Sequence, residues 1–201
     1  TADRIHSLGD NAEAEFLKAL YDISSKQFNS AMIHYGNALE NSAGGKYEEL
    51  YKAFYYMNRA VLRADMIEFI SSIENNVQTL TMDDQGTTRA RVKDQVSMGY
   101  DYSDAVADMR TAAGIVGDIP YIHFNLGNLL CLSSSFVEAI DSYSRAISLY
   151  PYMGDAYFNR GLVLIYLKDK EKGCIDLSHA GELGVADAYG VIKKYCEEAE
   201  Q

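Results

Sequence analysis

Basic residues are scarce in this 201-residue chain, as are proline, cysteine and tryptophan. Its 18 lysines and arginines stand against 29 aspartates and glutamates, and the formal net charge is −11. A protein that binds nucleic acid needs a basic face to neutralise phosphates, and an anionic membrane surface repels so acidic a chain. We therefore expect neither nucleic acid nor an anionic membrane as a partner.

The low numbers of proline and cysteine limit the possible architectures. Two prolines leave room for long uninterrupted helices, and three cysteines without a CxxC pair argue against a disulfide framework. No apolar run approaches the length of a transmembrane helix, so we expect no membrane insertion. The chain starts at Thr1 and not at methionine, so we expect a soluble mature product or fragment, cytoplasmic or exported after loss of a signal. The compartment stays open.

Catalytic and metal-binding motifs are missing as well. The four histidines lie far apart without HxxxH or HExxH spacing, and there is no GxSxG, phosphate-binding loop or cysteine–histidine signature. The pair Asp83 and Asp84 lacks the further ligands of a calcium loop. We therefore predict a protein that is not an enzyme and holds no cofactor or metal ion.

What the sequence does contain is a repeat of 34 residues. The stretch FNLG at Phe124–Gly127 returns as FNRG at Phe158–Gly161, and small residues recur at Ala105, Ala139 and Gly173. Each small residue is followed by a large side chain after four residues and by alanine after seven. Residues seven apart lie on one helical face, and small ones let a neighbouring helix approach closely. Helix pairs that each need the next pair to cover them form a solenoid.

This pattern resembles the tetratricopeptide repeat family, whose consensus is W-x2-L-G-x2-Y…A-x3-F…P over 34 residues. The unit that begins at Pro120 matches it at Leu126, Gly127, Ala139 and Tyr143. The resemblance implies an all-α solenoid of about four helical-hairpin units in one superhelical domain. The units are expected at about residues 12–45, 47–119, 120–153 and 154–187, followed by a capping helix at about residues 185–199.

The second unit carries about 33 extra residues. Its first helix contains MNRA at Met57–Ala60, but the next matching alanine, Ala105, comes 47 residues after Asn58 and not 14. The extra residues could form a degenerate helical pair, since their number is close to one repeat. Alternatively, the first helix continues through ADMIEFISSIENN at residues 64–76 and the chain then forms a β-hairpin, in an insertion at about residues 71–100 where Val, Thr and Arg flank a DDQG turn. The composition favours the hairpin, which is our prediction.

Asparagines mark the candidate binding surface. Asn58, Asn125 and Asn159 each stand two residues before the small residue of a first helix. First helices line the concave face in the tetratricopeptide repeat family, so the resemblance places these asparagines in a row along a groove. An asparagine side chain offers a donor and an acceptor to the backbone of an extended peptide. The alternative is that the asparagines bond to neighbouring helices within the scaffold.

Residues at helical spacing complete this peptide-binding groove, with aromatic rings for contact area. Leu132 and Asp155 fall on the same face, whereas Arg59 and Arg160 are expected to point toward the contact between helices. The predicted groove residues are Asn58, Tyr121, Phe124, Asn125, Asn128, Phe158, Asn159, Leu162 and Tyr166.

The predicted function is a non-catalytic scaffold that binds a protein or peptide partner in this groove. Two alternatives remain open. One is a structural module that self-associates through the inserted hairpin, and the other is a regulatory domain of a larger protein.

Overall fold

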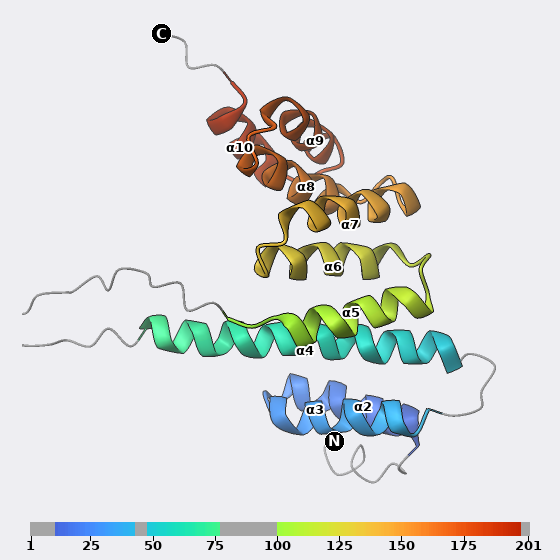
Figure 1. Cartoon of the computed structure of the whole chain (residues 1–201). Coiled ribbons are helices and arrows are strands. Elements are labelled where there is room, and N and C mark those ends of the chain that lie inside the picture. Colours follow the sequence, from blue (N-terminus) through green and yellow to red (C-terminus); the bar gives the residue numbers. More distant parts are fainter. Residues whose placement is uncertain (1–10, 43–47, 77–99, 198–201) are drawn as a thin grey trace, which may run out of the picture.

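The computed structural model describes residues 11–42, 48–76 and 100–197, most of which lie in α-helices. Within these ranges there is no strand, and no helix is long and apolar enough to cross a membrane. The helices form one stack in chain order, with α2 and α10 at its opposite ends (Figure 1). They are α2 (Ala12–Ser24), α3 (Phe28–Glu40), α4 (Glu48–Asn76), α5 (Ser103–Ile115), α6 (Pro120–Leu132), α7 (Phe136–Leu149), α8 (Gly154–Tyr166), α9 (Lys170–Glu182) and α10 (Asp187–Tyr195).

Successive helices pack in pairs, α2 with α3, α4 with α5, α6 with α7 and α8 with α9, and α10 packs on α9. Three pairs share one turn geometry, whose middle residue has a positive φ: Lys26 at 58°, Ser134 at 59° and Lys168 at 70°. The next residue donates its N–H to a carbonyl five residues back, as Ser135 does to Leu130 at 2.7 Å. This bond gives a partner to a backbone carbonyl at the end of the first helix, at the point where the chain reverses direction. The helices of a pair therefore lie antiparallel.

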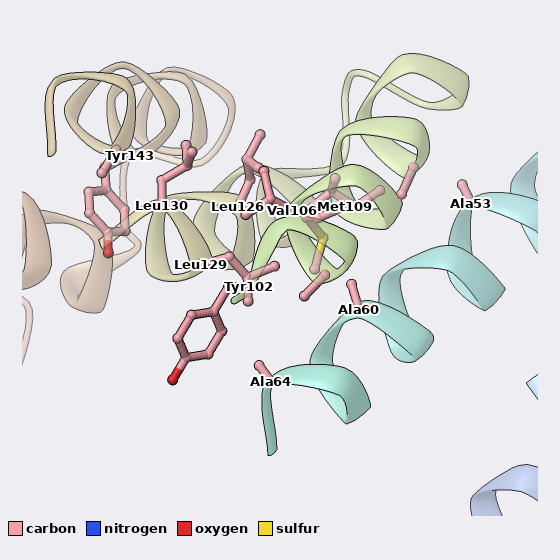
Figure 2. Close-up of a cluster of buried hydrophobic side chains, with 14 of the residues drawn as sticks. Ala53, Ala60, Ala64, Tyr102, Val106, Met109, Leu126, Leu129, Leu130 and Tyr143 are labelled. Carbon is pink, nitrogen blue, oxygen red and sulfur yellow. The ribbon is translucent and has the colours of Figure 1, made fainter. Parts of the chain in front are cut away.

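Small residues bring the helices close together, as the repeat predicts. Figure 2 shows Ala53 and Ala60 on the side of α4 that faces Met109 of α5, and all three side chains are fully buried. At Gly127 of α6, an added Cβ atom would lie 2.5 Å from the ring of Tyr143 in α7. That approach leaves no room for any side chain, so the glycine is required by helix packing.

Two partly buried ion pairs join the first helix of a pair to the second. Arg59 of α4 donates to both carboxylate oxygens of Asp108 in α5, at 2.8 and 2.7 Å. Arg160 of α8 binds Asp176 of α9 in the same two-pronged way, at 2.7 and 2.8 Å. The expected direction of both arginines, into the contact between helices, is confirmed.

A further set of buried polar contacts joins α2 to α3 around Glu15, whose side chain is 3% exposed. Lys18 and Asn37 donate hydrogen bonds to its carboxylate at 2.7 and 2.9 Å, and the Nδ1 atom of His34 lies 2.8 Å away. The other ring nitrogen of His34 is 3.6 Å from Asp22. Burial disfavours the ionised form of Glu15, but the hydrogen bonds outweigh it and lower its pKa to about 2. The cluster therefore holds a buried carboxylate in its charged state.

Helix α4 corrects one expectation about the insert. It spans 29 residues, against 13 or 14 for each of α5 to α9. The expected continuation of the first helix through residues 64–76 is confirmed, so residues 71–76 of the predicted insertion are helical and not part of a β-hairpin. The ladder of helical hydrogen bonds continues because residues 64–76 contain no proline or glycine to interrupt it. The remainder of the predicted hairpin, residues 77–99, lies outside the described residues.

A disulfide is the second correction. The odd cysteine count argued against a disulfide framework, but Cys174 of α9 and Cys196 just after α10 are bonded, with their Cα atoms 5.7 Å apart. The reason is tertiary: α10 packs back on α9 and brings together two residues that are 22 apart in the sequence. Cys131 is a free thiol.

Candidate functional site

A hollow of about 500 Å³ lies where α6 and α8 face each other. Its walls are mostly apolar, with two asparagine side chains among them and one carboxylate contributed by α4. The lining consists of Glu68 of α4, of Asn128, Cys131 and Leu132 of α6, of Phe136 and Tyr143 of α7, and of Asn159, Leu162, Val163 and Tyr166 of α8.

Hydrogen bonds fix the two asparagines of the hollow. The Oδ1 atom of Asn128 accepts one bond from the hydroxyl of Tyr143, at 2.8 Å, and another from Nδ2 of Asn159, at 2.9 Å. In this arrangement the NH2 group of Asn128 lies on the other side of its amide, away from Tyr143 and Asn159. Neither that NH2 group nor the Oδ1 atom of Asn159 is bonded to any residue that the structure describes.

The polar groups next to the asparagines stay uncharged at neutral pH. Burial raises the pKa of the Tyr143 hydroxyl well above its usual range, and the contact with Cys131 raises it further. Burial also raises the pKa of the Cys131 thiol, although its 3.5 Å contact with Tyr143 acts in the opposite direction. Both groups therefore keep their protons, and the thiol is a poor nucleophile. Apart from the carboxylate of Glu68, the hollow therefore offers neutral hydrogen bonding and apolar contact.

Five side chains that the sequence assigned to the groove face meet in this hollow. They follow one another at steps of three or four residues along α6 and α8, starting from Asn125 in α6 and from Asn159 in α8. Three of them, Leu132, Leu162 and Tyr166, remain exposed, at 41%, 37% and 64%. The five are Asn128, Leu132, Asn159, Leu162 and Tyr166.

The other predicted groove residues lie elsewhere. Asn58 donates its side-chain N–H to a backbone carbonyl of its own helix at 2.8 Å, so its amide bonds within the scaffold. Tyr121 and Phe124 border a second hollow, of about 390 Å³, at the ends of α6 to α9. Asn125 and Phe158 are half-buried and line neither hollow.

Five lining residues were not predicted as site residues: Glu68, Cys131, Phe136, Tyr143 and Val163. Cys131 follows Asn128 by three residues, a helical spacing that could have identified it. Tyr143 was assigned to packing alone, and it does pack, but its hydroxyl also orients the asparagine pair. Glu68 carries no such signal, because it lies beyond the point where the repeat predicts the first helix to end.

Metal binding has no support in the described ranges. No three His, Cys, Asp or Glu side chains converge there in a way that would hold an ion.

Solved structures with the same architecture identify the fold. YrrB, described as a TPR protein with an unusual peptide-binding site, aligns with a TM-score of 0.60 and 13% identity, over 90% of this chain and 74% of its own. MamA aligns with a TM-score of 0.62 and 13% identity, over 93% of this chain and 86% of its own. TTC0263, a thermophilic TPR protein of Thermus thermophilus, aligns with a TM-score of 0.59 and 13% identity, over 97% of this chain and 85% of its own.

Sequence comparison adds nothing to this likeness, since no protein-family model and no curated protein matches the chain. At 13% identity the structural likeness shows the fold. The chain has the tetratricopeptide-repeat fold, as the 34-residue pattern predicted.

Proposed function

We propose that this chain, built on the tetratricopeptide-repeat fold, is a non-catalytic scaffold that binds an extended peptide segment of a protein partner in the hollow between α6 and α8. One observation carries the proposal. The NH2 group of Asn128 and the Oδ1 atom of Asn159 are a donor and an acceptor whose side chains are already fixed, and neither has a partner among the described residues.

A fixed donor–acceptor pair matches the chemistry of a peptide backbone. An extended segment presents N–H and C=O groups that do not bond to each other, and the N–H and C=O of one residue point to the same side, where they can pair with both asparagines. Because Tyr143 and Asn159 already hold the amide of Asn128, little side-chain freedom is lost on binding. The asparagines can therefore orient a bound peptide with little loss of their own side-chain entropy.

The apolar lining supplies contact area beside that pair. The ring of Phe136 packs on the ring of Tyr166 with centroids 4.7 Å apart, and Leu132 and Leu162 flank them from α6 and α8. Large exposed rings and leucines around a few oriented polar groups are typical of peptide and ligand sites. The peptide-binding site in the description of YrrB supports the same class of function for this fold.

The test is a selection of random dodecapeptides, displayed on phage, against the immobilised full chain. The affinities of the enriched peptides are then measured by fluorescence anisotropy for the chain and for the variant Asn159→Ala. We expect Asn159→Ala to weaken binding about tenfold, the usual cost of losing one or two hydrogen bonds. The matched control is Asn29→Ala, which removes an exposed asparagine of α3 outside the hollow.

Two outcomes contradict the proposal. Selection that enriches no peptide would refute peptide binding by this chain. Enriched peptides that bind the chain and Asn159→Ala equally well, with both proteins folded by circular dichroism, would place binding outside the hollow.

A further inference from the structure

The unusual length of α4 gives the hollow its single acidic group. In α6 and α8, the helix ends seven residues after the asparagine of the repeat, at Leu132 and Tyr166. The equivalent end of α4 would be Asp65, but the helix continues to Asn76. Its C-terminal part extends well past the N-terminal end of α5 in Figure 1. Glu68 belongs to this extension, so the hollow has a carboxylate in its lining because the helix does not stop.

Glu68 is accompanied by a second carboxylate. Asp65 lies three residues earlier, and residues three apart share one face of a helix. The surrounding protein shields Asp65 from part of the solvent and raises its pKa, and the negative charge of Glu68 raises it further. The two carboxylates therefore interact, and neither forms an ion pair or hydrogen bond with another described residue.

The nearby cations of α4 are committed elsewhere. Arg59 is bound to Asp108 at 2.7 Å, and Arg63 lies 3.3 Å from the same carboxylate and 3.5 Å from Asp104. Both arginines thus face α5. The lining of the hollow contains no lysine, arginine or histidine. The negative charge at this edge of the hollow is therefore not balanced by the described part of the chain.

We propose that the peptide bound in this hollow carries a lysine or arginine whose cationic end pairs with Glu68 and Asp65 while its neighbours fill the apolar wall. The inference rests on the proposed function and adds the chemical class of the partner to it. Three features favour a basic side chain: complementary charge, an aliphatic stem that suits the walls formed by Leu132 and Tyr166, and an aromatic ring with which a cation interacts favourably. An acidic peptide would instead bring a third negative charge to the same edge.

The same phage selection tests the inference through the composition of the enriched peptides. We expect lysine or arginine at one constant position. The net charge of −11 attracts cationic peptides without specificity, so enrichment alone is not sufficient. A double-mutant cycle separates the local pairing from this general attraction.

In the cycle, the enriched peptide and a copy with norleucine in place of its basic residue are titrated against the chain and against Glu68→Gln/Asp65→Asn. On the unmodified chain, norleucine should weaken binding on the order of fivefold, as expected for one partly exposed ion pair. On the double variant, the two peptides should bind within about twofold of each other, because the local pairing is gone. The control Asp141→Asn/Glu171→Gln makes the same charge change at exposed positions outside the hollow and should behave like the unmodified chain.

The outcomes separate this inference from the function on which it rests. Enriched peptides without a constant basic residue, or an equal loss with norleucine on all three proteins, would overturn the inference. If Asn159→Ala still weakens the binding of those peptides, the proposal of peptide binding in the hollow stands. If they are not, both proposals fail.

Discussion

The buried carboxylate of Glu15 makes the stability of α2 and α3 depend on pH in a way that can be calculated. Its pKa is lowered from 4.5 to about 2, and a shift of that size corresponds to about 3 kcal/mol. The side chain is 3% exposed, so solvent screening reduces this figure little. A lowered pKa in the folded state means that the ionised form stabilises the fold. The contribution is complete above pH 4.5 and is lost as the pH falls from 4.5 through about 2.

The perturbation is Glu15→Gln, which keeps the shape of the side chain and removes its charge. At pH 7 the variant should lose up to about 3 kcal/mol of unfolding free energy relative to the unmodified chain. At pH 3 the unmodified chain has itself lost about 2 kcal/mol of this contribution, so the gap between the two proteins should narrow by that amount. Urea denaturation followed by far-ultraviolet circular dichroism at the two pH values measures the gap.

The control for this experiment is Glu13→Gln. Glu13 lies in the same first turn of α2, where a carboxylate also interacts with the helix dipole, but its side chain is exposed. Glu13→Gln should change the free energy of unfolding at pH 7 by less than about 1 kcal/mol, because solvent screens an exposed carboxylate. The reasoning is refuted if the difference in unfolding free energy between the unmodified chain and Glu15→Gln is the same at pH 7 and pH 3. It is also refuted if the difference for Glu13→Gln decreases by as much between the two pH values.

Two further predictions concern packing and the C-terminal helix. Gly127→Ala places a Cβ atom 2.5 Å from the ring of Tyr143, and overpacking of this kind should lower the free energy of unfolding, measured with heat or urea, by about 1–3 kcal/mol. The control Gly36→Ala, with nothing within 4 Å of the new atom, should be neutral or stabilising. Equal effects of the two substitutions would contradict the close approach of α6 and α7. The disulfide closes a loop with a sequence separation of 22 residues, so Cys196→Ser should lower the free energy of unfolding by about 3 kcal/mol. The variant should also melt at the same temperature with and without reductant. If the unmodified chain melts at the same temperature with and without the bond between Cys174 and Cys196, the bond does not stabilise α10.

The sequence determined the repeat, and with it the fold class. Ala105 and Ala139 recur 34 residues apart because the same contact between helices is made in successive pairs, so the spacing carries its own structural meaning. The periodicity also identified the buried face of each helix and the face on which Asn128 and Asn159 lie. These features depend on residues within one helix or one turn, which is the range over which sequence patterns are informative.

Tertiary structure decided which of those residues form a site. Asn58 and Asn128 occupy similar faces of their helices, but Asn58 bonds to its own helix, whereas Asn128 bonds to Tyr143 of a second helix and to Asn159 of the next pair. Periodicity shows which side of a helix is covered, but it cannot show which side chain lies opposite, because that depends on the separation and angle of helices that are distant in the sequence.

The same reason explains two features that the sequence did not reveal, the position of Glu68 at the hollow and the disulfide. Glu68 reaches the hollow because α4 continues where its counterparts end, and Cys174 meets Cys196 because α10 packs back on α9. Each depends on where an irregular segment lies against the stack. The regular part of this protein is therefore encoded in its local pattern, whereas the site's charge and its covalent link arise where the pattern is interrupted and only packing sets the position of the chain.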